Sequence, residues 1–208
     1  ERAGRIEPGA HLVFVLLDGL GMNLMTRLPE DTFLRRQLQR SIRASCPSTT
    51  ACALTSIATG AWPSEHGVTG WFTHLPEHDF TLITLPMLDR STGKPILERG
   101  LGASGVLPVA AYHGALSSHP LTLLPHQLRD TVYARYSRAG TEAVGYESIA
   151  EAVERIVEHV AWGHARTYTH LYVPDVDTAC HHDGTRAPGD LEHVLRIDAE
   201  LARLRERL

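Results

Sequence analysis

Apolar residues gather in short runs along this chain, and two spacings alternate. Leu12–Leu17 is a continuous apolar run, which is typical of a strand buried on both faces of a parallel sheet. Shorter mixed runs predict further strands at Ser41–Ser45, Phe80–Leu85, Glu142–Tyr146 and Thr169–Val173. Thr131–Tyr136 resembles a strand as well, and we expect it to form a hairpin with Glu142–Tyr146 around residues 137–140.

Other stretches place apolar residues every three or four positions, the period of a helix with one buried face. The clearest starts with the capping box Ser148-Ile-Ala-Glu151 and continues through Val153, Ile156, Val157 and Val160. A closing helix is expected from Asp190, where Leu191, Val194, Leu195, Ile197, Leu201 and Leu204 recur. Shorter helices are expected at Met22–Leu28, at Asp31–Gln39 and from Thr50 to Ala58, the last ending at Gly60.

This alternation of strands and helices predicts an α/β fold with a mostly parallel sheet between layers of helices. In open sheets of this kind, ligands bind beyond the carboxyl ends of the strands. Asp18, Thr50 and the pair Asp177 with His181 each follow a predicted strand. We therefore expect these polar residues to share one crevice.

Composition narrows the classes of partner. The 208 residues are 43% hydrophobic and 21% charged with a net charge of −4, values typical of a globular domain. The chain has no basic cluster, so binding to a nucleic-acid polymer is not expected. No apolar run approaches the ~20 residues of a membrane span. Lys94 is the single lysine, a bias typical of some bacterial genomes. The chain begins at Glu1, so its N-terminus is interpreted as trimmed, and localisation stays open between cytoplasm and export.

Asp18 and Thr50 each have a chemical and a structural interpretation. A carboxylate directly after a buried strand can bind a metal ion, but Asp18-Gly19 can equally form a turn. Thr50 at the start of a helix is well placed as a nucleophile, because exposed N–H groups there favour phosphate. Its hydroxyl needs a base or a metal to lower its pKa. The alternative is that Ser48, Thr49 and Thr50 only cap the helix.

Asp177 and His181 stand four residues apart. On a helical turn they would lie on one face and could bind the same metal ion. His182 is the rival imidazole, but it would point roughly 100° away on a helix. The alternative is a polar loop with a solvated pair of histidines.

The order of these motifs resembles the alkaline phosphatase superfamily, and within it the type I phosphodiesterase/nucleotide pyrophosphatase family. The resemblance lies in Val13–Gly19 (VFVLLDG), Pro47–Thr50 (PSTT), Thr59–Gly67 (TGAWPSEHG) and Asp177–Gly184 (DTACHHDG). In the family, a nucleophilic threonine or serine lies ten residues before the glycine of the Thr-Gly pair. Counting back from Gly60 gives Thr50. His66 is interpreted as part of the scaffold.

This resemblance implies a three-layer α/β/α sandwich, alkaline phosphatase-like, with two divalent metal ions, usually zinc. Asp18 and Thr50 would face one metal, and Asp177 and His181 would bind the other. The implied activity is that of a phosphodiesterase acting on a small-molecule phosphate ester through a phosphothreonine intermediate at Thr50. Nothing in the sequence indicates an oligomeric state.

The chain departs from the family pattern near its end. The family completes its site with an Ala-Asp-His-Gly motif on a later strand and a more distant histidine, and neither follows the helix expected from Asp190. We therefore expect a single catalytic-type domain over residues 1–208 that lacks its C-terminal part and is inactive by itself.

Two other functions stay open at this point. Phosphomonoesterases, phosphonate hydrolases and phosphomutases share the scaffold of this superfamily. A non-catalytic domain that binds a phosphorylated ligand or a partner would also account for a metal site without its second half.

Overall fold

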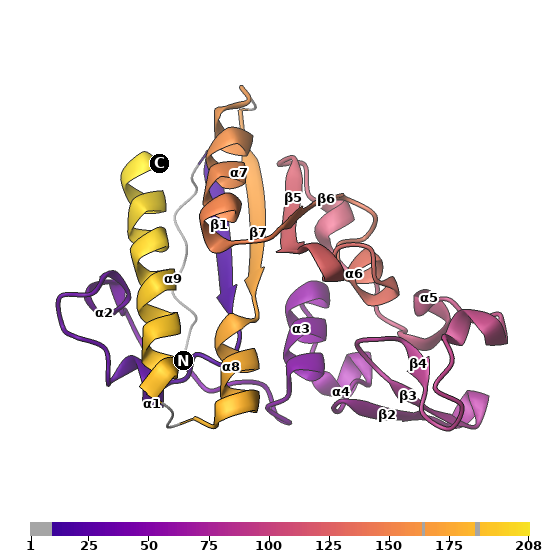
Figure 1. The fold of residues 1–208 in the computed structure, drawn as a ribbon. Coiled ribbons are helices and arrows are strands. Elements are labelled where there is room, and N and C mark those ends of the chain that lie inside the picture. The colour runs from indigo at the N-terminus through magenta and orange to yellow at the C-terminus, as the bar shows by residue number, and fades with distance from the viewer. Residues whose placement is uncertain (1–9, 164, 186–187) are drawn as a thin grey trace.

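The central sheet is parallel, and its strands lie far apart in the sequence (Figure 1). The structure, a computed structural model, describes residues 10–163, 165–185 and 188–208. In these residues the sheet consists of β1 (His11–Leu17), β5 (Pro120–Pro125), β6 (Glu142–Tyr146) and β7 (Thr167–Val173), in the order β1-β7-β5-β6. Every neighbouring pair is parallel. The strands predicted around Leu12–Leu17, Glu142–Tyr146 and Thr169–Val173 are confirmed.

Helices cover both faces of this sheet, as the three-layer prediction requires (Figure 1). Leu171 and Val173 of β7 pack in one apolar core with α7 (Ile149–Ala161) and α9 (Pro188–Arg207). Tyr172 lies on the opposite face and packs against α3 (Thr50–Thr59) and α6 (Val132–Ser137). Burial on both faces explains why β7 is buried at every position.

The N-terminus of α7 is capped almost as its sequence predicts. Ser148 Oγ accepts a hydrogen bond of 3.2 Å from the backbone N–H of Glu151. The Glu151 carboxylate reaches back to the N–H of Glu147, at 2.9 Å, rather than to that of Ser148. Both interactions satisfy N–H groups that the first helical turn leaves without a partner.

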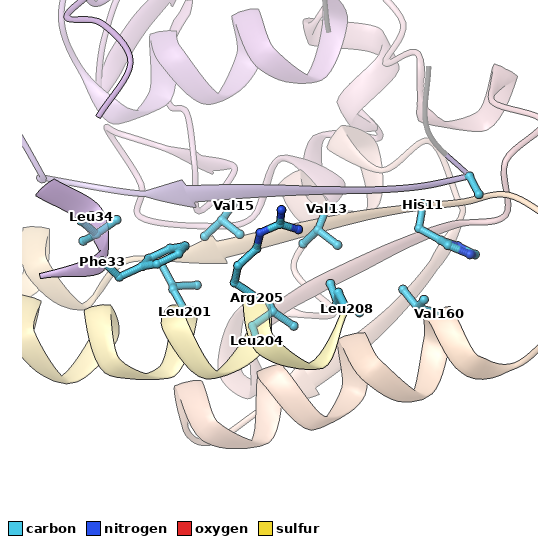
Figure 2. Close-up of a pocket in the computed structure, with 11 residues that line it drawn as sticks. His11, Val13, Val15, Phe33, Leu34, Val160, Leu201, Leu204, Arg205 and Leu208 are labelled. Atoms are coloured by element: carbon cyan, nitrogen blue, oxygen red, sulfur yellow. The ribbon is translucent and has the colours of Figure 1, made fainter. Parts of the chain in front are cut away.

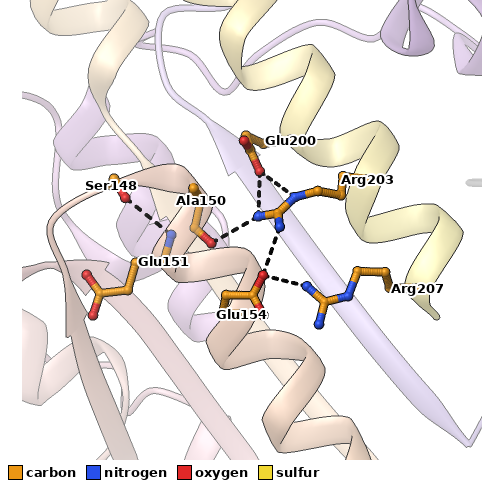
Figure 3. Close-up of polar contacts among 7 residues, drawn as sticks. All are labelled: Ser148, Ala150, Glu151, Glu154, Glu200, Arg203 and Arg207. Atoms are coloured by element: carbon orange, nitrogen blue, oxygen red, sulfur yellow. Dashed lines mark hydrogen bonds and ion pairs between the residues drawn. The ribbon is translucent and has the colours of Figure 1, made fainter.

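Polar contacts join α7 to α9 (Figure 3). The Arg203 guanidinium donates to Glu154 at 2.8 Å and to Glu200 at 2.9 Å, and Arg207 also donates to Glu154, at 2.5 Å. Arg203 donates in addition to the carbonyl of Ala150 at 3.3 Å. Because these charges are exposed, water screens each pair and its contribution to stability is small. The buried apolar side chains between the helices contribute most of the stability of this layer.

The other end of this layer covers β1 (Figure 2). Side chains of α9, including Leu201 and Leu204, face Val13 and Val15 of β1. The short α2 (Phe33–Gln37) completes this layer. Its first two N–H groups donate to the buried Asp198 carboxylate of α9, at 3.0 and 2.6 Å. A carboxylate at a helix N-terminus is favoured by the helix dipole, so this contact fixes α2 on α9.

A smaller antiparallel sheet lies beyond α3. It consists of β2 (Phe72–Leu75), β3 (Phe80–Ile83) and β4 (Leu88–Asp89), and β3 confirms the strand predicted at Phe80–Leu85. Leu82 of β3 shares a buried core with Met87 and Ile96 of the adjoining segments and with Ala51 of α3. Short helices connect the rest: α4 (Pro63–His66), η1 (Pro76–His78), η2 (Ile96–Arg99), α5 (Ala103–Val106), η3 (His113–Ala115) and η4 (His126–Leu128). None of the helices described is long and apolar enough to cross a membrane.

Two predicted strands are wrong. Ser41–Ser45 adopts no regular secondary structure, and its one large apolar side chain, Ile42, is 81% exposed. The expected hairpin is absent because residues 132–137 form α6, whose cap is the Thr131 hydroxyl accepting from Ala134 N–H at 3.2 Å. Glu142–Tyr146 pairs with β5 in parallel instead. Two early helices are shorter than predicted: α1 spans Met22–Met25, and α2 lies within Asp31–Gln39.

Candidate active site

The main chain joins the two acidic residues that the sequence singled out. Asp18 follows β1 directly, and its N–H donates to the Val173 carbonyl of β7 at 2.9 Å. The N–H of Asp177, in the first turn of α8 (Asp175–Asp183), donates to the Asp18 carbonyl at 3.1 Å. The end of β1 and the start of α8 are therefore held together at the carboxyl edge of the sheet, where the fold places ligands.

Gly19 makes this approach possible. Its φ is +77°, and a Cβ built there would lie 2.6 Å from both the N and the Cα of Asp177. An L side chain is disfavoured by the left-handed backbone and has no room against the α8 backbone. The Asp18-Gly19 pair is thus a turn, as one interpretation held, and the turn also brings the two acidic residues together.

Replacing Gly19 with alanine is expected to push α8 away from β1. The left-handed backbone alone costs roughly 1–2 kcal/mol for a residue with a side chain. Contact with the Asp177 backbone adds to that loss. Gly67→Ala is a matched control, because Gly67 has a φ of +72° but open space around a built Cβ. In urea denaturation Gly19→Ala should lose clearly more stability than Gly67→Ala. Equal losses would show that the close approach is unimportant.

The charges around Asp177 favour a bound cation. Burial and the nearby Asp18 charge raise the pKa of Asp177, while His181 acts in the opposite direction. Tyr172 donates its hydroxyl to Asp18 Oδ2 at 2.7 Å, and burial and the Asp18 charge raise the pKa of this phenol. Two carboxylates whose charges repel each other are stabilised when a cation lies between them. The sequence prediction did not include Tyr172.

His181 lies beside Asp177, as the four-residue spacing requires. α8 is helical across both residues, and His181 Nε2 is 3.6 Å from Asp177 Oδ2. The His181 side chain is 80% exposed, so it is free to rotate toward a ligand. His182 faces away, into a surface hollow that Asp175 and Asp183 also line. Of the two imidazoles, His181 is the one the helix brings to Asp177.

Thr50 is the first residue of α3, and its neighbour performs the capping. Thr49 Oγ1 accepts from the N–H of Cys52 at 3.4 Å, so the cap belongs to Thr49. Within the described residues, no hydrogen bond to the half-buried Thr50 hydroxyl is found. Leu54, one turn further along α3, packs in the cluster that contains Tyr172. Thr50 therefore stands at the start of α3, and its hydroxyl is not used to cap the helix.

His66 belongs to the scaffold, as interpreted from the sequence. It is 1% exposed, its Nδ1 accepts from the N–H of Val68 at 3.1 Å, and its Nε2 lies 2.9 Å from Ser56 Oγ. With Nδ1 as acceptor, the neutral ring donates from Nε2 to the serine. Burial lowers the pKa of His66, which keeps the ring neutral.

The donor set agrees with divalent metal chemistry. Carboxylate oxygens and an imidazole nitrogen are common zinc ligands. In the part of the chain that the structure describes, no group of three or more His, Cys, Asp or Glu side chains could hold a metal ion. The described contacts bring these residues together in pairs. Asp18 meets Asp177 through the main chain, and Asp177 meets His181 through side chains.

Comparison with known proteins identifies the family. The profile of the type I phosphodiesterase/nucleotide pyrophosphatase family matches residues 12–208. The chain therefore belongs to this family, within the alkaline phosphatase superfamily. No individual curated protein sequence matches it significantly.

Solved structures of one relative share the fold. Murine ectonucleotide pyrophosphatase/phosphodiesterase 5, as an inactive variant with one threonine replaced by alanine and in complex with AMP, superposes with a TM-score of 0.66. It is 13% identical, and the match covers 95% of this chain and 52% of that one. A second structure of the same murine protein gives a TM-score of 0.65 at 13% identity, covering 94% and 51%. At this identity the likeness shows the fold, and the chain spans about half the length of the relative.

Proposed function

We propose that this chain contributes the nucleophile and part of the metal site of a phosphodiesterase that hydrolyses small phosphate esters. The observation that carries this proposal is the main-chain contact of 3.1 Å that holds Asp18 and Asp177 together at the carboxyl edge of the sheet. The chain belongs to the type I phosphodiesterase/nucleotide pyrophosphatase family, and for this reason we assign the catalytic site to that edge.

Thr50 is the nucleophile in this proposal. Its oxygen attacks phosphorus and one alcohol of the diester leaves with a proton. Water then hydrolyses the phosphothreonine bond, which releases the phosphate monoester and restores the Thr50 hydroxyl. The N-terminus of α3, a helix of ten residues, favours the negative charge of the phosphoryl group. That the murine relative is inactive with a threonine replaced by alanine supports this role.

Asp18 and Thr50 would hold one divalent ion, and Asp177 and His181 the other. Zinc at these positions would lower the pKa of the attacking hydroxyl and stabilise charge on the phosphate oxygens. Tyr172 orients the Asp18 carboxylate through its 2.7 Å hydrogen bond, and Gly19 allows Asp177 its place beside Asp18. The substrate is proposed to be a diester or pyrophosphate, because the family is named for phosphodiesterases and nucleotide pyrophosphatases.

The experiment uses the full natural protein and two chromogenic esters. Bis(4-nitrophenyl) phosphate should be hydrolysed faster than 4-nitrophenyl phosphate. Dialysis against a chelator should abolish the reaction, and zinc should restore it. Bound zinc, measured by atomic spectrometry, should fall in Asp177→Asn and be retained in His182→Ala. Hydrolysis that survives complete metal removal would contradict the metal site, and preference for the monoester would contradict the diesterase assignment.

A further inference from the structure

A largely apolar cavity lies next to the candidate active site. Its volume is about 290 Å³, and it lies between α3, α6 and the face of the sheet that they cover. Apolar and aromatic side chains form most of its wall, among them Leu54, Ala58, Trp71, Leu124, Tyr133 and Ala134. A cavity near 300 Å³ is at the lower end of the range for small-molecule sites, so it has room for a ligand of one or two rings.

Three polar groups in the cavity wall are buried without a partner. They are Nε2 of His113, Nε2 of His170 and Oγ1 of Thr122. The residues are 1%, 8% and 4% exposed. Buried polar atoms in proteins are nearly always hydrogen-bonded, so three that converge on one cavity indicate a place where a ligand supplies the missing bonds.

The hydrogen bonding of His113 shows which kind of group is missing. Its Nδ1 lies 2.8 Å from the Ser137 carbonyl and must donate to it. Burial lowers the pKa of His113, so the ring is neutral and Nε2 carries a lone pair. Burial lowers the pKa of His170 to about 4, with His113 adding to the effect. The cavity therefore presents an uncharged acceptor at His113 Nε2, which suits an N–H or O–H donor.

The surrounding rings favour a flat ligand. His113 stacks between Tyr112, at 4.6 Å between centroids and 26° between planes, and His170, at 5.6 Å and 12°. These contacts hold both imidazoles in fixed orientations. Trp71 and Tyr133 supply further aromatic surface in the wall. Aromatic walls pack well against a planar ring, whereas an ammonium or carboxylate group would lose its hydration here.

We propose that this cavity binds a small, uncharged aromatic molecule whose N–H or O–H group donates a hydrogen bond to His113 Nε2, with Thr122 as the neighbouring polar contact. The cavity shares Tyr172 with the acidic pair, because that side chain lines the cavity and donates to Asp18. Leu54 in its wall is one turn from Thr50. The ligand is thus either the organic group of the ester substrate or a free molecule beside it. Only the first source rests on the proposed function.

The direct test uses calorimetry to measure how tightly indole and 1-methylindole bind to the full natural protein. The two probes have nearly the same shape, but only indole has an N–H donor. Indole should bind roughly fivefold or more tightly, the effect of one hydrogen bond to a neutral acceptor. In nitrogen-15 NMR spectra of the histidine side chains, the His113 Nε2 resonance should shift when indole is added and should not shift with 1-methylindole. Equal affinities, or no binding of either probe at millimolar concentration, would overturn the proposal.

A pair of isosteric variants locates the site. Thr122→Val removes a hydroxyl from the cavity wall. Thr169→Val removes a hydroxyl that is equally buried and without a partner, but does not line the cavity. The affinity for indole should change severalfold in Thr122→Val, because this side chain contacts the ligand, and stay unchanged in Thr169→Val. Equal effects of the two variants would contradict a site in this cavity.

Kinetics distinguish the two sources of the ligand. If the cavity holds the organic group of the substrate, indole should raise the KM for bis(4-nitrophenyl) phosphate and leave kcat unchanged. If it holds a separate molecule, indole should bind without changing KM. Because the calorimetric arm needs no turnover, a failure of the proposed phosphodiesterase activity would leave the binding result intact.

Discussion

Thr50→Ala is expected to abolish ester hydrolysis while Thr49→Ala retains it. Loss of a catalytic nucleophile lowers turnover by on the order of 10⁴-fold or more, because the remaining groups have nothing to position for attack. The fold should survive, since the described structure gives the Thr50 hydroxyl no hydrogen bond and Thr49 provides the cap of α3. Bound metal, measured by atomic spectrometry, should be mostly retained in Thr50→Ala.

Thr49→Ala is the matched control, one residue away in the same loop. Removing a capping hydroxyl costs about 1 kcal/mol of stability. Thermal denaturation should therefore show the larger loss for Thr49→Ala, and turnover assays the larger loss for Thr50→Ala. If Thr50→Ala retained turnover, the nucleophile would have to be a different group. If both variants lost turnover equally, the geometry of the loop and not the Thr50 oxygen would be the essential feature.

The stability of the protein should fall by about 3 kcal/mol between pH 6.5 and pH 4 through His170 alone. Burial, and to a lesser degree His113, lowers the pKa of His170 from 6.5 to about 4 in the folded state. The unfolded chain therefore binds a proton in this window that the native state does not bind. Since stability decreases where the unfolded state binds more protons, the contribution is complete above pH 6.5 and is lost toward pH 4.

The measurement compares the free energy of unfolding of wild type and His170→Phe at several pH values. Other histidines and the carboxylates add their own pH dependence, so the difference between the two curves is the quantity that tests His170. That difference should change by about 3 kcal/mol across the window. His182→Phe, at an exposed position, should leave the shape of the curve unchanged. Parallel curves for wild type and His170→Phe would contradict the shifted pKa.

The sequence alone predicts an element correctly where the residues that determine it lie within one short segment. The apolar run at Leu12–Leu17 and the cap at Ser148 each act within a few residues, and β1 and α7 are where they were expected. Of the two alternatives left open for Asp177 and His181, the helical one is found, in α8. Ser41–Ser45 and Thr131–Tyr136 failed because strand formation depends on a partner. Among the residues that the structure describes, the first segment pairs with no strand, and the cap at Thr131 makes the second a helix.

The rest of the candidate site depends on contacts distant in sequence. Tyr172 meets Asp18 because β7 pairs with β1 in a register that sets Leu16 opposite Tyr172, across more than 150 residues. The same pairing turns His170 toward the cavity, where it meets His113 of η3. Alternation along β7 could have shown that His170 and Tyr172 share one face. It could not show what faces them.

The bond between the Asp177 N–H and the Asp18 carbonyl has a consequence for substitution, because it joins main chain to main chain. Such a joint does not depend on which side chains occupy the two positions. The side chain at either position can therefore be exchanged without rebuilding the strand–helix junction. Gly19 carries the opposite constraint, since any side chain there meets the partner backbone. The junction therefore depends on the glycine, whereas the two carboxylates matter to the proposed chemistry and not to the joint.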